Sequence, residues 1–277
     1  MDNDDALVGR IFSRRDAIRL TARAGVGLAI AGMFRGSTSF AAPTTQPHLP
    51  LVASPTMTEG PFFVDEKLNR TDLTSGTTRK SVVNGLPLAL AFTVYKLTGD
   101  KYAPLPGAQV DVWHADAAGV YSDEDHPMNH ENTASEKWLR GYQLSDDDGN
   151  ANFKTIFPGW YRGRAPHIHF KVRQMTPDGK STADFTSQLF FHEADANRIY
   201  SQGIYAANGA HDTRNTDDGI FTERQKDGSM AGDYMLLDLT RSGAGYAAAF
   251  PIILTDANLN GRSGRAGFRG PPPRRRD

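Results

Sequence analysis

Residues 159–173 decide the fold, and they read GWYRGRAPHIHFKVR. From position 167 onward, polar or charged residues alternate with apolar ones. Side chains on a β-strand point alternately to its two faces, so the pattern predicts a strand with His167 and His169 on one face. Two residues along a strand separate their Cα atoms by roughly 6.5 Å, which lets both imidazoles reach one metal ion. The stretch therefore predicts a β-strand that carries a candidate metal site.

Taken alone, the His-x-His pair is a weak signal, because alternating polar residues are common on a solvated strand face. Its neighbours strengthen it. Arg164 precedes the first histidine by three residues and can hold an anionic oxygen beside a metal. Tyr161 lies just upstream, and Tyr121 follows the end of another apolar run. A phenolate suits ferric iron, although most tyrosines are core aromatics with a hydrogen-bonded hydroxyl.

The chain from about Ser54 onward predicts an all-β fold. Short apolar or alternating runs are separated by clusters of glycine, proline and aspartate, as is typical of a β-sandwich. We expect mostly antiparallel strands, long loops and few short helices. The expected strands are residues 86–97, 108–114, 151–157, 167–173, 188–192 and 235–239. The long loops at 123–137 and 194–230 are the expected places for a binding site.

Both ends of the chain differ from this domain. Residues 13–20 read SRRDAIRL, residues 24–34 are small and apolar, and small residues follow near Ala41. This order resembles a twin-arginine export signal, the alternative being an amphipathic helix with a chance arginine pair. We expect a signal peptide over 1–42, a domain over 43–258 and a disordered Gly/Arg/Pro-rich tail over 259–277. The exported protein would be periplasmic or extracellular, without a stable membrane anchor after cleavage near Ala41 or Ala42.

Composition removes several classes of function. The chain has 277 residues, a formal net charge of −1 and no cysteine. A nearly neutral charge argues against nucleic acid or an anionic membrane surface as a partner. Without thiols there are no disulfides, iron–sulfur clusters or zinc–thiolate sites, so a metal must take nitrogen or oxygen ligands.

Several blocks of the sequence resemble the intradiol ring-cleavage dioxygenases, the family of catechol and protocatechuate dioxygenases. The blocks are TEGPFF at 58–63, residues 106–121, TIFPGWY at 155–161 and RAPHIHF at 164–170. Their order matches the family, and blocks of this length are far more specific than any lone motif. The resemblance is clear over about residues 56–195, and the rest of the chain is only compatible with it.

The resemblance implies a set of site residues. One non-haem Fe(III) per chain would be bound by four ligands, namely Tyr121, Tyr161, His167 and His169. Arg164, Tyr161 and Gln188 would be catalytic: Tyr161 would take up a substrate proton, and Arg164 would stabilise negative charge on the ring. Gln188 is placed by the pattern Gln-Leu-Phe-Phe, with Ser187 as the alternative.

The activity that the resemblance implies is cleavage of a catechol-type ring by dioxygen, giving a muconate-type dicarboxylate. The partners would be a catechol or related phenol and dioxygen, with the choice of catechol and a homo-oligomeric state left open. The chain resembles the compact protocatechuate-type subunits more than the members with a helical N-terminal region. The alternatives are a copper or ferrous site that oxidises phenols, a secreted non-catalytic β-sandwich that binds aromatics or polysaccharide, and a structural module.

The remaining histidines are expected outside the metal site. We expect His114 and His192 to be structural, and His126, His130 and His211 to be solvated on loops.

Overall fold

The structure, a computed structural model, describes residues 52–260. The chain divides into two units, Met1–Val52 and Ala53–Asp277, and the strands and helices below belong to the second. The predicted signal peptide lies outside the described residues, as do all but the first two residues of the predicted tail. Within residues 52–260, no helix is long and apolar enough to cross a membrane.

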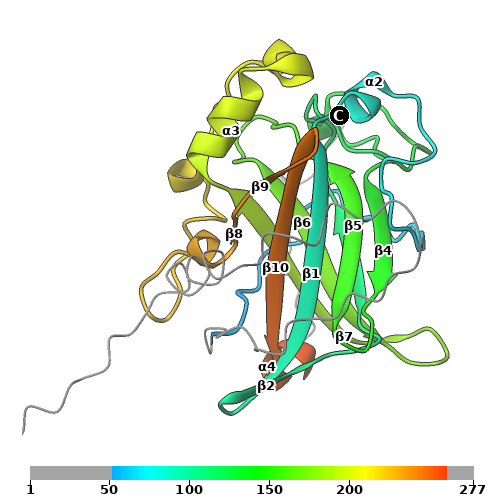
Figure 1. Cartoon of the computed structure of the whole chain (residues 1–277), viewed down its shortest axis with the longest axis vertical. Helices are drawn as coiled ribbons and strands as arrows, with labels where there is room; N and C mark the ends of the chain where they lie inside the picture. The colour runs from blue at the N-terminus through cyan, green and yellow to red at the C-terminus, as the bar shows by residue number, and fades with distance from the viewer. Residues whose placement is uncertain (1–51, 261–277) are drawn as a thin grey trace, which may run out of the picture. The chain divides into compact units, whose positions relative to one another are not determined.

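The first of two five-stranded sheets is built around a parallel pair. β1 (Pro87–Thr98) pairs in parallel with β10 (Gly245–Thr255), and the two run side by side in Figure 1. The other edge of β1 pairs antiparallel with β5 (Asn150–Ile156) and then with β2 (Lys101–Pro104). β9 (Thr240–Ser242) completes the sheet beside β10.

The second sheet carries the predicted His-x-His strand. Its order is β4 (Arg140–Leu144), β3 (Gln109–Trp113), β6 (His167–Met175), β7 (Ser181–Phe191) and β8 (Leu236–Leu237). All its pairs are antiparallel except β7 with β8. Two mixed sheets therefore form a sandwich whose pairings are mostly antiparallel, which confirms the predicted fold class.

The core lies between the two sheets and follows from alternation along the strands. Every second residue of β1 from Leu88 to Val94 is buried. From β6, Ile168, Phe170 and Val172 belong to the same apolar cluster. The rings of Phe92 on β1 and Phe170 on β6 lie 5.3 Å apart, which joins the sheets. Each such side chain contributes roughly 1.5–3 kcal/mol by leaving water.

The polar face of β6 is also buried, which alternation alone did not predict. Lys171 and Arg173 are only 4% and 7% exposed. Lys171 pairs with Glu59, and Arg173 pairs with Asp65 and Asp111 at 2.9 and 2.7 Å. The segment 57–66 therefore covers the outer face of β6, where the histidines also lie.

Within residues 52–260 the helices are few and short, as expected. The α-helices are α2 (Lys80–Val83), α3 (Glu193–Tyr200) and α4 (Asp256–Asn260). Short 3₁₀ helices are η2 (Pro127–Asn129), η3 (Gly203–Asn208), η4 (Asn215–Asp217) and η5 (Ala231–Tyr234). The long loop expected at 194–230 thus contains most of α3, then η3 and η4. Leu259 in α4 is 5% exposed, so ordered structure passes the expected domain end at 258.

Candidate metal centre and active site

Four side-chain donor atoms converge on the outer face of β6. The Nε2 atoms of His167 and His169 lie 3.1 Å apart. The Tyr121 and Tyr161 hydroxyl oxygens lie 3.4 and 3.3 Å from His167 Nε2. The structure therefore brings together the four residues that the resemblance names as metal ligands.

The sheet fixes both imidazoles. His169 lies opposite Trp113 of β3 and Gln188 of β7, and the Trp113 indole stacks on it with ring centroids 4.8 Å apart. His167 Nδ1 lies 2.6 Å from the Ala165 carbonyl oxygen. Because a carbonyl only accepts, Nδ1 carries the proton, and Nε2 presents its lone pair to the other donors.

Tyr121 is held by the loop that follows β3. Its backbone N–H donates to the Asn129 side-chain oxygen at 2.7 Å, and Asn129 Nδ2 donates back to its carbonyl at 2.9 Å. The Thr133 hydroxyl also donates to that carbonyl, at 2.6 Å. Asn129 is 2% exposed, so these bonds form away from water and fix the Tyr121 backbone.

Tyr161 lies on the loop after β5, which packs against the Tyr121 loop through a glycine. Gly119 has φ +83°, and a Cβ atom there would collide with the Trp160 carbonyl. Glycine is therefore required both by backbone conformation and by close approach. Gly159 N–H donates to the Asp116 carbonyl at 2.8 Å, which joins the same two loops.

The four side chains fit a metal ion. Burial and the charge of Arg164 lower the pKa of His167 to about 3, and burial and His167 hold the pKa of His169 well below its ordinary value. Burial and Tyr161 raise the pKa of Tyr121 well above its ordinary value. The Nε2 atoms of two neutral imidazoles lie close enough to donate their lone pairs to one cation, and His169 Nδ1 is buried without a hydrogen-bond partner.

No group of three or more His, Asp or Glu side chains in residues 52–260 is arranged to hold a metal. A metal at this centre would therefore need the two phenols beside the two imidazoles. Phenolate oxygen and imidazole nitrogen form a hard donor set that favours ferric over ferrous iron.

Arg164 and Gln188 lie beside the four donors as one hydrogen-bonded unit. Arg164 Nη2 donates to Gln188 Oε1 at 2.6 Å, and Gln188 Nε2 donates to the Thr58 carbonyl at 2.8 Å. Ser187, the alternative to Gln188, pairs with Phe170 on the core-facing register, and its hydroxyl bonds to Pro55. The geometry therefore places Gln188, and not Ser187, next to Arg164.

Asp218 is a site residue that the sequence did not reveal. Its fully buried carboxylate accepts from Arg164 Nε and from the Ala165 N–H, both at 2.8 Å. It lies in the long loop expected at 194–230, among many acidic residues, so no local pattern distinguishes it.

The other histidines occupy separate places. His114 is fully buried, with Nδ1 2.8 Å from the Ala115 carbonyl and Nε2 2.7 Å from the Thr155 hydroxyl. His192 precedes α3 and lies 2.9 Å from Asp238. His130 is exposed, and His126 is half-buried against Phe62. His211 differs from expectation, because its side chain is 3% exposed and contacts Glu193 at 3.4 Å.

Comparison with known proteins agrees with this geometry. A family model described as Dioxygenase matches residues 58–211, more than half of the chain. The sequence is 31% identical over 112 residues to a catechol 1,2-dioxygenase of Acinetobacter baylyi and 39% identical over 96 residues to one of Candida albicans. These alignments cover 39% and 28% of this chain and 32% and 30% of those proteins. The chain therefore matches about a third of the length of these curated relatives.

Solved structures share the fold. An intradiol ring-cleavage dioxygenase from Tetranychus urticae matches with a TM-score of 0.60 and 24% identity, over 74% of this chain and 94% of that one. A second dioxygenase matches with a TM-score of 0.61 and 25% identity, over 76% and 98%. The family match spans the segment over β6, both tyrosine loops and β6 itself. The chain therefore belongs to the intradiol ring-cleavage dioxygenase family.

Proposed function

We propose that this chain is a non-haem ferric-iron dioxygenase that cleaves a catechol-type ring between its two hydroxyl-bearing carbons, giving a muconate-type dicarboxylate. The observation that carries the proposal is the convergence of two phenols and two neutral imidazoles on one point, within about 3.4 Å of His167 Nε2. Members of the family typically use non-haem Fe(III). When bound by these four residues, iron would supply Lewis-acid chemistry that activates a bound catechol ring toward dioxygen.

The two tyrosines are held differently, which supports different roles. Tyr121 is 1% exposed and its backbone is fixed by Asn129, so it suits a permanent ligand. Tyr161 is half-buried; burial raises its pKa above the ordinary value, and the charge of Arg164 offsets part of that rise. Tyr161 is therefore the phenol better placed to exchange a proton with an incoming catechol.

Arg164 is held ready for an anion. Its Nε and Nη2 atoms are taken by Asp218 and Gln188, which fix the plane of the guanidinium. A fixed cation beside the metal ligands stabilises negative charge that develops on a bound ring without reorganising during the reaction.

The test is a visible absorption spectrum of the purified, iron-analysed protein, before and after anaerobic addition of catechol. We expect a broad tyrosinate-to-iron band that moves to longer wavelength with catechol. Iron-replete protein without the band would contradict the proposal and favour another metal chemistry. Protein that takes up no metal would favour a non-catalytic sandwich that binds aromatics or polysaccharide.

Variants separate the proposed roles. Tyr161→Phe and His169→Ala should each lose iron or activity, because each removes a ligand. Arg164→Ala should keep the colour and lose turnover. Tyr95→Phe, on β1 away from the centre, is the matched control and should keep both. A wild-type rate in any of the first three variants would contradict the role proposed for that residue.

We also propose that the protein is exported through a twin-arginine-type signal. The arginine pair at 14–15, the apolar run at 24–34 and the small residues near Ala41 support it by their order. N-terminal sequencing of the protein recovered outside the cytoplasm should begin near Ala42. A product that still begins at Met1 or Asp2 would contradict cleavage.

A further inference from the structure

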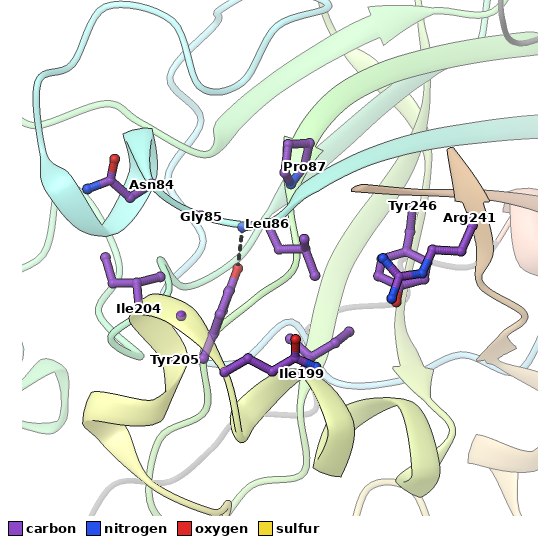
Figure 2. A pocket seen from close by; sticks show the side chains of 11 residues that line it. Asn84, Gly85, Leu86, Pro87, Ile199, Ile204, Tyr205, Arg241 and Tyr246 are labelled. Carbon is purple, nitrogen blue, oxygen red and sulfur yellow. Dashed lines mark hydrogen bonds between the residues drawn. The ribbon is translucent and has the colours of Figure 1, made fainter. Parts of the chain in front are cut away.

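A cavity of about 260 Å³ lies among residues that take no part in the candidate metal centre. It forms where the start of β1 meets α3, η3, β9 and β10 (Figure 2). Its lining residues are Asn84, Gly85, Leu86, Pro87, Ile199, Gln202, Gly203, Ile204, Tyr205, Arg241 and Tyr246. For scale, an apolar cavity of about 150 Å³ accepts benzene. The space is therefore large enough for one ring with a substituent.

Most of the walls are apolar. Leu86 and Ile204 are half-buried, and Pro87 is exposed, so their apolar surfaces remain partly open to a ligand. Tyr205 is buried and its hydroxyl is fully used: it accepts from the Leu86 N–H at 3.0 Å and donates to the Phe157 carbonyl at 2.6 Å. Tyr205 is thus a fixed aromatic wall with no free polar atom, and Figure 2 shows it directly below Leu86.

One side of the cavity carries a positive charge. Arg241 is exposed, and its guanidinium lies over the Tyr246 ring at 4.8 Å from the centroid. Arg198 lies 5.1 Å from the same ring and donates to its hydroxyl, so Tyr246 is fixed in turn. Arg198 also pairs with Asp195. Among residues 52–260, no carboxylate lies within ion-pair distance of Arg241. Stacking on the ring leaves its edge N–H groups directed sideways, where a planar anion can accept two of them.

We propose that this cavity is a second small-molecule site, which binds an organic anion with a flat apolar body, such as a single-ring aromatic carboxylate. The ring would pack on Leu86, Ile204 and Tyr205, and the carboxylate would pair with Arg241. Apolar walls with one convergent cation are the usual composition of a small-ligand site. The site does not depend on the proposed dioxygenase function, because it shares no residue with the metal centre.

The test is isothermal titration calorimetry of the full chain with benzoate, with benzamide as the uncharged analogue and inorganic phosphate as the anion without a ring. Wild-type protein should bind benzoate at one site outside the metal centre, benzamide more weakly, and phosphate not measurably. Arg241→Gln should weaken benzoate about tenfold and leave benzamide within about twofold. Ile204→Trp, which fills the cavity, should abolish binding of both aromatic ligands.

Two controls keep the outcomes distinct. Arg224→Gln removes another exposed arginine outside the cavity and should leave benzoate affinity unchanged. Arg164→Ala reports on the metal centre and should also leave it unchanged. Benzoate binding that is insensitive to Arg241→Gln and Ile204→Trp, that disappears only in Arg164→Ala, or that is absent from wild-type protein would overturn the proposal. The visible spectrum tests the dioxygenase function separately.

Discussion

The Asp218 carboxylate bonds to two separate parts of the candidate centre. It accepts from the Arg164 guanidinium and from the Ala165 N–H, and the carbonyl of the same Ala165 residue accepts from His167 Nδ1. Asp218 therefore orients the Arg164 guanidinium directly and the His167 imidazole through a single peptide unit. Such supporting groups typically change metal affinity or activity by about 10–100-fold when altered.

For Asp218→Asn we expect kcat to fall about tenfold to hundredfold, because Arg164 loses its charged partner. The visible band should remain, since all four proposed ligands are intact, but its position with bound catechol should shift. Asp217→Asn changes an exposed neighbour and is the matched control. Unchanged kcat and an unchanged substrate-bound spectrum would show that Asp218 serves the fold alone.

His114 should give stability a pH dependence, because burial lowers its pKa to about 4. In the unfolded chain its pKa is close to 6.5, so the folded state binds the proton less well. The stabilisation is complete above about pH 6.5 and is lost as the pH falls toward 4. By pH 5.0 this group should have lowered the free energy of unfolding by about 2 kcal/mol relative to pH 7.5.

Urea unfolding of wild-type protein and His114→Asn at both pH values checks this expectation. The free energy of unfolding should differ between pH 7.5 and pH 5.0 by about 2 kcal/mol less in the variant than in the wild-type protein, whatever the overall stability of the variant. An equal difference in both proteins would mean that the other buried histidines account for the whole effect.

At the scale of elements, the centre depends on contact between two loops. The loop after β3 and the loop after β5 approach so closely that Gly119 faces the Trp160 carbonyl. Gly119→Ala should cost about 1–2 kcal/mol from its left-handed backbone and a further 1–3 kcal/mol from the collision. Gly179→Ala shares a positive φ, +78°, but has open space around it, and should cost only the first amount. If thermal or urea unfolding showed equal losses of stability in Gly119→Ala and Gly179→Ala, the collision with the Trp160 carbonyl would not contribute.

Sequence patterns predicted the elements whose signals are local. The alternation of residues 167–173 located β6, and turn residues around the apolar runs located most of β1, β3 and β5. β10 was not predicted, because GYAAAFPIILT lacks alternation and contains a proline. β7 begins at Ser181, seven residues before the strand expected at 188–192, and its first two residues, Ser181 and Thr182, are polar and exposed.

The burial of Lys171 and Arg173 could not be predicted either. Their partners Glu59 and Asp65 come from a segment more than 100 residues earlier, and only the fold places it over β6. Asp218 could not be predicted for the same reason, because its partners Arg164 and Ala165 lie more than 50 residues earlier in the chain. The resemblance of short sequence blocks to a family allowed the sequence analysis to identify four candidate ligands, namely Tyr121, Tyr161, His167 and His169. Sequence spacing predicted proximity only for the two histidines, and the fold brings the two tyrosines to them.

For the whole molecule, one core joins both sheets, so a core defect should weaken all of it. Phe92 is fully buried and contacts Phe153 and Phe170. Phe92→Ala should lower the free energy of unfolding by about 3–5 kcal/mol. Val83→Ala, at a side chain 61% exposed on α2, should change it by less than about 0.5 kcal/mol. Urea unfolding of both variants measures the two changes in the free energy of unfolding. Similar losses in Phe92→Ala and Val83→Ala would contradict a shared core.

The parallel pairing of β1 with β10 also constrains how the chain folds. Leu88 pairs with Tyr246, and Leu97 pairs with Thr255. One edge of β1 can therefore form its hydrogen bonds only with residues that are synthesised more than 150 positions later. Contacts this distant in sequence slow folding, because loop closure must precede any gain from pairing. The sheet can therefore close only after residue 255 has left the ribosome. Until then the nascent chain presents an unpaired strand edge beside apolar side chains, the kind of surface that chaperones protect from aggregation.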